Sequence, residues 1–504
     1  MRACLLLGVL AVASACHQAP PEPGMLTVAM ASSPNNLDPR MGTDSYSVRA
    51  HQLLFSNLVR LDDGVQPAPN LAASWETADY KTYRVNLRRD VKFHNGRQLT
   101  AADVVFTFTS ILDPKTSSPL RGGFRMIDTV SAIDPYTVQF VLKEASGAFV
   151  VNLVAVMIVP DGSGRDLRDH PVGTGPYEFV SFAADDRLVV KAFPEYFDGR
   201  PRNNGVTLKV VPDDIMRGLE LRKRTSQLVI NDLAPDIAYQ LEKDGLRLDR
   251  APGLNYQYLG FNMRDPILQD VRVRHAIGYA IDRESIVEYL RRGLATPAVG
   301  MLSPSNWAFE PDVFDFTYDP DTARRLLDEA GYTDPDGDGP RPRLSLSLKV
   351  SSANEFNRLQ SSVIQQNLRE VGIDLDVRTY EFATLFADIQ KGHFQMYTLQ
   401  WAGGATADPD ILRRVFHSQQ VPPAGFNRGH LSDPELDRLI DEATLATSID
   451  ERKARYSKVQ KRVAELAPYI SLWIETNIAV SQPDLQGIHL SPQTDFTFLR
   501  NVSR

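Results

Sequence analysis

The sequence predicts a mixed α/β protein. Short segments in which apolar and polar residues alternate indicate half-buried strands, and capped stripes of apolar residues at helical spacing indicate helices between them. Of the 504 residues, 43% are hydrophobic, 23% are charged and 9% are aromatic, which is the composition of a folded chain. This length leaves room for roughly three domains. No internal repeat of about 20–50 residues indicates a solenoid.

The strands are predicted from alternation. Leu344–Val350 is the clearest case, because leucine or valine occupies every second position and successive strand residues point to opposite faces of a sheet. Four other segments alternate less regularly. The predicted strands are Leu26–Met30, Tyr83–Leu87, Tyr136–Leu142, Arg187–Ala192 and Leu344–Val350.

Helices are predicted where a capping residue precedes an apolar stripe. Thr100 and Asp103 have the spacing of a capping box. Asp319 and Asp433 each precede a proline, which suits the first helical position. Gly331 follows one stripe at the position of a C-terminal cap. The apolar stripes, which we assign to the core, cover residues 104–108, 323–330, 356–371, 436–440 and 456–466.

The first residues are predicted to be an export signal. Arg2 precedes a short apolar run, residues 5–13, that ends in small residues, which is the pattern of a cleaved signal peptide. The run is too short for a membrane span, which needs about 20 apolar residues. We therefore expect residues 1–15 to be removed on export.

Cysteine usage indicates a lipid anchor. Cys4 and Cys16 are the two cysteines, and cleavage after residue 15 would leave Cys16 at the new N-terminus. This resembles the bacterial lipoprotein signal, in which that cysteine receives lipid, although Ala13 stands where leucine is usual. A plain secretory signal cut nearby is the alternative. Residues 16–24 form a Pro-rich tether, so we expect an exported protein, periplasmic or at the cell surface, anchored to a membrane through Cys16.

Charge and motifs exclude several classes of function. The net charge of -8 argues against a strongly basic nucleic-acid binder. The sequence has no serine-hydrolase elbow, phosphate loop or His-Glu-x-x-His motif, and its nine histidines are scattered. We predict no catalytic residue, metal site or cofactor. Residues 334–339 match the start of a calcium loop, but Ser345 stands where a bidentate glutamate belongs, so a solvated turn is the simpler interpretation.

Several sequence blocks, in a fixed order, resemble one family. Each block alone is weak. Together, over about residues 26–480, they identify the chain as a member of the large extracytoplasmic solute-binding proteins of ABC transporters, family 5, which includes oligopeptide, dipeptide and nickel binders. The blocks are Asn36–Pro39, Leu71–Glu76, Tyr83–Arg88, Val91–Arg97, Leu99–Val105, Pro171–Tyr177, Asp270–Ala276, Ala280–Arg283, Tyr318–Pro320, Leu326 with Leu327, and Ala330–Tyr332.

This resemblance implies a periplasmic-binding-protein-like fold with two lobes, an inserted domain and a hinge between the lobes. A solute would lie in the cleft between the lobes, which close around it. The resemblance also implies a monomeric receptor that delivers its solute to an ABC permease in the membrane. Lobe I would comprise residues 25–44, 169–262 and 477–504, the inserted domain 45–168, and lobe II 263–476.

The resemblance also locates a candidate solute site. In peptide-binding members a tryptophan, matched here by Trp401, is followed shortly by an aspartate that pairs with the peptide's α-ammonium group. The matching position is Gly404. Since an unpaired buried charge is costly, either Asp408 or Asp44 substitutes for this acid or the solute is not a simple peptide. The candidate ligand-binding residues are Thr43, Asp44, Ser45, Phe382, Gln400, Trp401, Ala402, Gly403, Gly404, Asp408 and Asn427.

These residues also have plainer interpretations. Trp401 could be a core residue, Asp408 a helix cap before Pro409, and Thr43 and Asp44 part of a surface turn. The functional prediction is a receptor that captures a peptide or similar organic solute without changing it. The alternatives are a non-peptide solute, such as a metal chelate, an opine or a sugar-like molecule, and an exported hydrolase, for which no catalytic constellation is visible.

Overall fold

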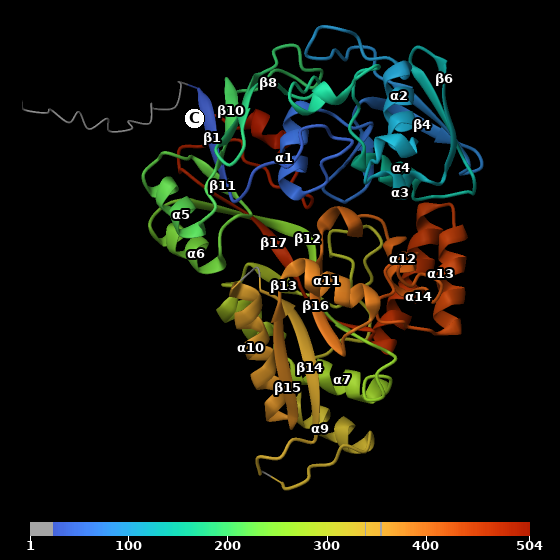
Figure 1. Cartoon of the computed structure of the whole chain (residues 1–504), viewed down its shortest axis with the longest axis vertical. Coiled ribbons are helices and arrows are strands. Elements are labelled where there is room, and N and C mark those ends of the chain that lie inside the picture. Colours follow the sequence, from blue (N-terminus) through green and yellow to red (C-terminus); the bar gives the residue numbers. More distant parts are fainter. Residues whose placement is uncertain (1–23, 338, 353–354) are drawn as a thin grey trace, which may run out of the picture.

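The computed structural model describes residues 24–337, 339–352 and 355–504. The predicted signal peptide, the predicted lipidation site Cys16 and the tether up to residue 23 lie outside the described residues. Within the described residues the chain is mixed α/β, as the sequence predicts, and strands alternate with helices along most of its length (Figure 1).

Two long antiparallel strands, β12 (Arg247–Phe261) and β17 (Tyr469–Ser481), run through the middle of the molecule and connect its two halves (Figure 1). Their pairing shifts register between Pro252 and Tyr256. On one side of this shift β17 pairs with β11 (Leu228–Ile230), and on the other side β12 pairs with β16 (Met396–Trp401), so the two segments belong to different halves. We call residues 24–252 and 476–504 the upper half, and residues 256–474 the lower half.

Eleven of the described strands form one sheet that extends on both sides of this pair. In the upper half β1 is parallel to its neighbours β10 and β11, and in the lower half β14 is parallel to β15 and β16. The order is β15 (Ile373–Tyr380), β14 (Leu344–Ser351), β16 (Met396–Trp401), β12, β17, β11 (Leu228–Ile230), β1 (Met25–Met30), β10 (Gly205–Val210), β9 (Arg187–Ala192) and β8 (Tyr177–Ala183), with β13 (Ala295–Pro297) on β17.

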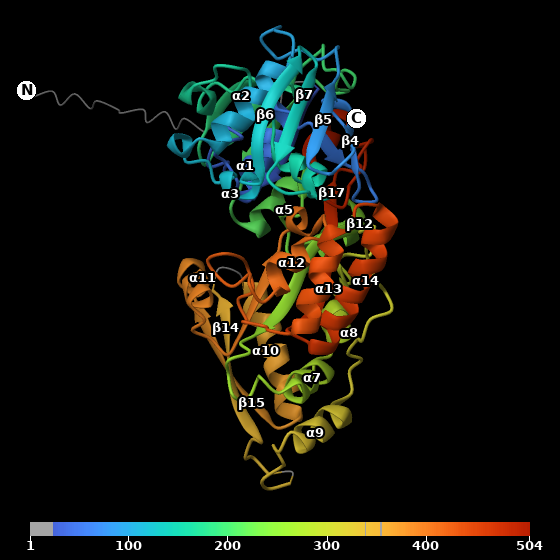
Figure 2. The same cartoon turned by 90° about the vertical axis from the view of Figure 1, so that its right-hand side faces the viewer.

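Residues 45–168 add a four-stranded antiparallel sheet, visible at the top of Figure 2. This segment has a hydrophobic core of its own, in which ring centroids lie 4.9 Å apart for both Phe108–Phe140 and Tyr83–Phe149. The strand order is β4 (Ala72–Thr77), β5 (Thr82–Leu87), β7 (Thr137–Leu142) and β6 (Ile127–Asp134), beside a separate pair of β2 (Val59–Leu61) and β3 (Pro67–Pro69).

Helices cover both sheets. The upper half contains α1 (Ser45–Leu54), α2 (Ala101–Leu112), α3 (Arg121–Phe124), α4 (Phe149–Asn152), α5 (Asp214–Arg222) and α6 (Pro235–Lys243). The lower half contains α7 (Val271–Ala280), α8 (Arg283–Ser285), α9 (Pro320–Glu329), α10 (Glu355–Glu370), α11 (Phe382–Lys391), α12 (Ile411–Phe416), α13 (Pro434–Leu445) and α14 (Ile449–Leu466). Short 3₁₀ or π turns occupy residues 114–116, 153–155, 165–168, 286–290, 403–406 and 496–501.

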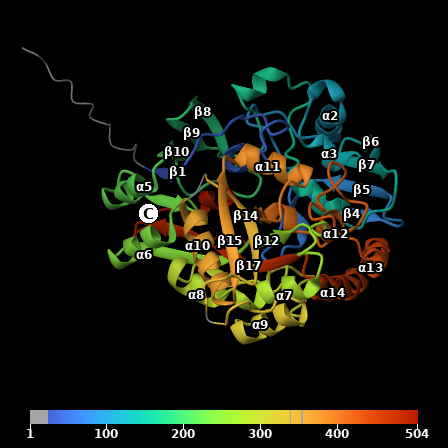
Figure 3. The same cartoon turned by 60° about the horizontal axis from the view of Figure 1, so that its bottom comes forward.

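The two faces of the lower sheet carry separate cores. Alternation along the strands sends Leu348 and Met396 into a core shared with α7, α9 and α10, and sends Tyr397 into a core shared with α11–α14. Figure 3 shows α7 and α9 on one side of β14 and β15, and α11 on the other. The lower sheet is therefore buried on both faces, as parallel sheets usually are.

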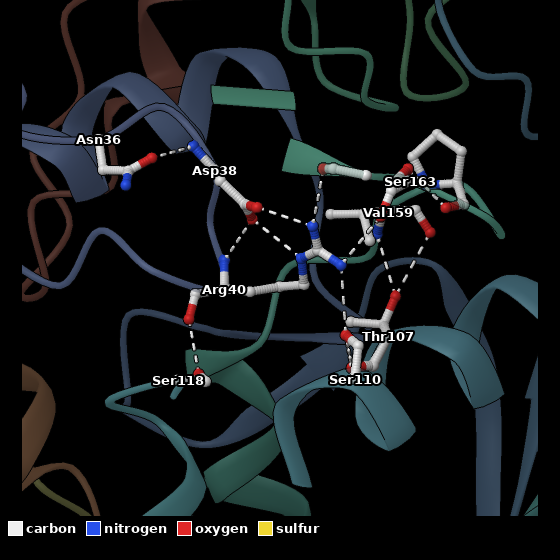
Figure 4. A network of polar contacts seen from close by, with 10 residues as sticks. Asn36, Asp38, Arg40, Thr107, Ser110, Ser118, Val159 and Ser163 are labelled. Atoms are coloured by element: carbon white, nitrogen blue, oxygen red, sulfur yellow. Dashed lines mark hydrogen bonds and ion pairs between the residues drawn. The ribbon is translucent and has the colours of Figure 1, made fainter. Parts of the chain in front are cut away.

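A buried ion pair joins the first loop of the upper half to residues 45–168 (Figure 4). Arg40 and Asp38 make two parallel hydrogen bonds, of 3.0 Å from Nε to Oδ1 and 2.7 Å from Nη2 to Oδ2. Arg40 Nη1 also donates to Ser110 Oγ in α2 at 3.4 Å, and Ser118 Oγ donates to the Arg40 carbonyl oxygen at 2.6 Å. Both charges are thus satisfied away from water.

The predicted strands are confirmed, with ends displaced by at most one residue. The predicted caps are confirmed as well. Asp319 and Asp433 each accept a hydrogen bond from a backbone N–H three residues on, at 3.0 and 2.7 Å. The Asp103 carboxylate accepts from the Thr100 N–H at 2.8 Å. Gly331, with a φ of 93°, follows α9 in a conformation that suits glycine.

The core assignment of the stripe 356–371 is wrong for two residues. Leu359 is 46% exposed and Val363 is 37% exposed. Helix α10 buries the face defined by Ile364 and Leu368 against the sheet. Because each helical residue turns by about 100°, Val363 points away from that face. The apolar pattern predicted the helix correctly but not the direction of its buried side.

The acid-rich turn 334–339 is held by an arginine. Asp336 accepts from the Arg341 backbone N–H at 3.2 Å, and its carboxylate lies 3.4 Å from the Arg341 guanidinium; Asp338 is outside the described residues. In the described part of the chain, no cluster of His, Cys, Asp and Glu side chains could hold a metal ion. Over the same residues, no helix is long and apolar enough to span a membrane.

Candidate functional site

The parallel strands of the two halves end facing the same place. In the upper half Ile230, the last residue of β11, pairs with Ala479, and β1 runs parallel to β11. In the lower half Trp401, the last residue of β16, pairs with Tyr256, which pairs in turn with Ile474. The carboxyl ends therefore converge from opposite directions on the middle of β12 and β17. Open α/β sheets bind ligands beyond such carboxyl ends.

Helix α11 brings an aromatic pair to this edge of the lower half. The helix follows β15, and Figures 1 and 2 both place it where the lower half faces the upper half. Phe382, its first residue, is 50% exposed and stacks on Phe386 with ring centroids 5.9 Å apart. A large apolar ring in contact with solvent is thus available at the candidate site.

Trp401 lies mostly in the core of the lower half. It is 9% exposed, and its ring packs against Phe426 with centroids 5.2 Å apart. Its indole Nε1 is buried and has no hydrogen-bond partner among the described residues. A buried indole N–H usually finds an acceptor. The Trp401 ring therefore packs in the core, while its indole N–H, at the end of β16, is a hydrogen-bond donor without an acceptor in the described part of the chain.

The glycines that follow Trp401 differ in the space around them. A Cβ on Gly403 would lie 2.9 Å from the Leu254 Cβ, so this position requires glycine, and its N–H donates to Asn255 Oδ1 at 2.9 Å. A Cβ on Gly404 would meet only Gln493 Nε2, at an ordinary 3.7 Å. The structure therefore has room for an acidic side chain at position 404. Steric crowding does not explain why glycine stands there.

Arg428 lies next to Trp401, among aromatic side chains. Its guanidinium carbon is 5.2 Å from the ring centroids of both Trp401 and Phe386, and 5.5 Å from that of Phe426. Nη1 donates to the Tyr258 hydroxyl at 3.2 Å, whereas Nε is buried without a partner among the described residues. Burial opposes the charge, but neighbouring tyrosines outweigh it and raise the pKa of Arg428, so the residue is a buried cation.

A second arginine flanks the same rings. The guanidinium carbon of Arg414, on α12, lies 4.6 Å from the Phe426 centroid, and the residue is exposed. Partial burial of the guanidinium lowers the pKa of Arg414. Within the described residues neither Arg414 nor Arg428 has a carboxylate within ion-pair distance. Neither guanidinium is therefore held in an ion pair in this part of the chain, although the charge of Asp410 acts on Arg414 from a greater distance.

The upper edge is electrically balanced. Asp232, just after β11, accepts from Arg49 Nη1 at 2.6 Å and from the Ala31 N–H at 3.2 Å. The side chains of Asp232 and Arg49 are 7% and 15% exposed. Burial and the nearby Asp232 raise the pKa of Tyr46, whose ring lies 4.9 Å from the Arg49 guanidinium carbon. At this edge the carboxylate of Asp232 and the guanidinium of Arg49 neutralise each other.

A match to a known family identifies the class of protein to which this fold belongs. The sequence model of the bacterial extracellular solute-binding proteins, family 5 Middle, matches residues 66–422. The chain belongs to this family. The resemblance inferred from the sequence blocks is confirmed, and the chain is a solute-binding protein.

Similar proteins span almost the whole of this solute-binding protein. Glutathione-binding protein GsiB of Pectobacterium atrosepticum is 30% identical over 487 residues, covering 94% of this chain and 92% of that protein. Heme-binding protein A of Haemophilus influenzae is 28% identical over 496 residues, covering 92% and 89%. The structure of the oligopeptide-binding protein AppA of Bacillus subtilis with a nonapeptide is 27% identical, has a TM-score of 0.76, and covers 95% of this chain and 98% of that one. The predicted two-lobed fold is confirmed.

Two residues predicted from the resemblance make hydrogen bonds within this solute-binding protein. Asp408 Oδ1 accepts from Arg452 Nη2 at 2.7 Å in a buried ion pair, and it also accepts from the Asp410 backbone N–H at 2.9 Å at the start of α12, which is the capping contact expected of an acid before Pro409. Asn427 donates to the carbonyl oxygens of His417 and Leu431 at 3.2 and 2.8 Å, so its amide braces a loop. Both interactions lie inside the lower half, while Asp408 Oδ2 is buried without a hydrogen-bond partner among the described residues.

The other predicted residues lie at the edges of the site. Asp44 caps α1 by accepting from the Ser47 N–H at 2.9 Å, which replaces the surface-turn interpretation and leaves it a poor substitute for the missing acid. Thr43 and Ser45 beside it are exposed, as are Gln400 and Ala402 around Trp401. No sequence signal pointed to Arg428 or Arg414, because a missing ion-pair partner becomes visible only in the folded chain.

Proposed function

We propose that this family 5 protein is the receptor of an ABC importer and captures a peptide or similar organic solute between its two halves. The observation that carries the proposal is the convergence of the strand ends of both halves, with Trp401 and Phe382, on the middle of β12 and β17. The family membership and the relatives named for glutathione and an oligopeptide support it. A permease in the membrane then receives the solute.

The proposed mechanism is closure of the two lobes about β12 and β17. The lobe boundaries are those predicted above: 25–44, 169–262 and 477–504 for lobe I, 45–168 for the inserted domain, and 263–476 for lobe II. A ligand favours the closed state only through contacts that it makes with both lobes. Addition of the bound solute should therefore reduce the radius of gyration in small-angle X-ray scattering, and an unchanged radius would reject closure.

A simple peptide with a free α-ammonium group is the less favoured solute. Gly404 provides no acid, the Asp44 carboxylate caps α1, and Asp408 is paired with Arg452. A non-peptide organic solute is the second candidate, favoured by this missing countercharge and supported by the relative named for heme. No catalytic step is assigned to either solute.

We extend the proposal to localisation and assembly. After cleavage, a lipid on Cys16 would hold the monomeric receptor at the membrane, with residues 17–24 as a tether. The Cys16→Ser variant should then move from the membrane fraction to the soluble exported fraction. Retention of that variant in the membrane would remove the lipid anchor from the proposal.

Native mass spectrometry of residues 17–504, purified gently, tests the receptor function. A bound small molecule should be released unchanged on unfolding and should raise the melting temperature when added back. The same preparation, incubated with that molecule, separates the alternatives. Consumption of the molecule would indicate an exported hydrolase, whereas saturable binding without turnover supports the receptor.

A further inference from the structure

Arg428 is the buried arginine whose charge the described protein satisfies least. It donates one side-chain hydrogen bond, to a hydroxyl group, and its Nε has no partner. Every other buried arginine either pairs with a carboxylate or donates to at least three backbone carbonyl groups. The carboxylate-paired ones are Arg40, Arg283, Arg291 and Arg452, and the carbonyl-bound ones are Arg217 and Arg274.

Burying a charge without a counterion is strongly unfavourable. The aromatic rings around Arg428 compensate in part, since cations are attracted to ring faces. They cannot replace an acceptor for Nε–H, however, because that atom is buried and unpartnered. An arginine at a position where its unpaired charge destabilises the fold indicates that a binding partner outside the chain supplies the acceptor.

The unused polar atoms around Arg428 are donors. The indole Nε1–H of Trp401 and the Nε–H of Arg428 are both buried and unpartnered among the described residues, and the guanidinium carbon is 5.2 Å from the Trp401 ring centroid. Neither group can accept a hydrogen bond. A charged guanidinium with a free N–H, beside a neutral indole N–H, is complementary to an oxyanion.

The path to solvent also favours an anion. Arg414, whose guanidinium carbon also lies close to the Phe426 ring, at 4.6 Å from its centroid, is exposed and has no ion-pair partner in the described residues. It adds a second positive charge at the solvent side. The half-exposed Phe382 stacks on Phe386, which covers Arg428. Rotation of these two side chains would open the guanidinium, and Gly404 keeps a negative charge off the neighbouring loop.

We propose that Arg428 and Trp401 bind an oxyanion group of the solute, a carboxylate or a group of the same charge, and that Arg414 draws it in. This inference rests on the proposed receptor function and names the chemical class of its solute. The charge pattern is the reverse of the ammonium-binding acid expected by resemblance. The solute is therefore recognised through its anionic end.

A library of matched pairs tests this assignment. It contains peptides of two to five residues as free acids and as C-terminal amides, each with a free or an acetylated amino group, and dicarboxylic acids and sugar phosphates with their neutral counterparts. Binding to residues 17–504 is screened by melting temperature, and hits are measured by calorimetry. The acids should bind at least about tenfold more tightly than their neutral partners, as a hydrogen bond to a charged group predicts.

Variants assign the effect to the named residues. Arg428→Gln should weaken the acids about ten- to a hundredfold and the neutral members less than about threefold, and Arg428→Lys should recover part of the loss. The exposed Arg414→Gln, which leaves the core untouched, should reduce the association rate and its salt dependence. Arg438→Gln is the matched control, because Arg438 is an exposed arginine on α13 that pairs with Glu442.

The possible results of these binding measurements separate the inference from the receptor function. Preference for acids that disappears in Arg428→Gln supports the inference. Equal binding of neutral members, or acid binding unchanged in Arg428→Gln and Arg414→Gln, overturns it while the receptor function stands. If no member of any class binds and no solute co-purifies, the receptor function fails and the inference fails with it.

Discussion

The two edges that meet at the centre of the molecule handle charge in opposite ways. On the upper side acids and bases are paired inside the protein, as in Asp232 with Arg49 and Asp38 with Arg40. On the lower side Arg428 has aromatic neighbours and a single hydroxyl acceptor. Charges paired inside the chain stabilise its fold, whereas a buried charge left unpaired reduces stability. Under the proposal above, the upper edge stabilises the fold and the lower edge selects the solute.

The largest expected effect is on the upper side. Arg40→Met leaves Asp38 buried without its partner and should reduce the free energy of unfolding by about 3–5 kcal/mol, measured by urea denaturation. Arg428→Met removes a buried charge that has no acid partner, so its free energy of unfolding should equal or exceed that of the parent. The exposed Arg60→Met is the control. Equal losses at residues 40 and 428 would erase the contrast between the two sides.

The upper half should also respond to acid. Burial lowers the pKa of His51 to about 4, below its ordinary value of 6.5, and Nε2–H of the neutral ring donates to the Asn36 carbonyl oxygen at 2.8 Å. Folding therefore favours the neutral ring. Its full contribution is present above pH 6.5 and is lost as the pH falls towards 4, by about 1.4 kcal/mol per pH unit.

Urea midpoints measured between pH 7 and pH 4 test the role of His51. The variant His51→Gln can keep a donor to Asn36 but cannot titrate, so its stability should change less over this range. His489→Gln is the control, since the His489 side chain is 65% exposed. A parent protein that is as pH-dependent as His51→Gln would show that other groups control acid stability.

The lower side offers a reversal of specificity. Gly404→Asp places an acid where the backbone has room, near Gln493, and should improve binding of peptides with a free α-ammonium group by about tenfold. It should weaken binding of anionic members of the library. Calorimetry with one peptide and its N-acetylated form measures the change. Gly404→Asn, which has the same shape without the charge, should show neither effect.

A smaller effect is expected from the indole donor. Trp401→Phe removes Nε1–H and keeps most of the ring, so affinity for an acidic solute should fall by a few-fold. Trp401→Ala is a poor test, because truncating a nine-tenths buried tryptophan would cost about 3–5 kcal/mol of stability. Unchanged affinity in Trp401→Phe would leave the oxyanion to Arg428 alone.

Local signals in the sequence predicted the elements well. Alternation located Leu344–Val350, and Asp319 caps α9 as its position before proline indicates. Such features depend on neighbouring residues, whose backbone geometry is fixed by short-range rules. The exposure of Leu359 was missed, since a periodic stripe does not say which part of it meets the sheet.

The site was predicted less well for a related reason. Asp408 and Asn427 were predicted as ligand-binding residues, but each has a partner within the protein, Arg452 for Asp408 and the His417 carbonyl oxygen for Asn427. Arg428 follows Asn427 directly, yet its importance comes from an absent carboxylate. Only the packed structure shows which charges remain without a partner.

The identity of the co-purified solute in the parent protein and in Arg428→Gln tests the central claim most directly. Native mass spectrometry of both proteins should find a molecule with a carboxylate or another oxyanion group bound to the parent. The variant should be at least as stable in urea and should carry no bound molecule. A neutral or cationic solute retained by both proteins would contradict the claim that the unpaired arginine selects the solute.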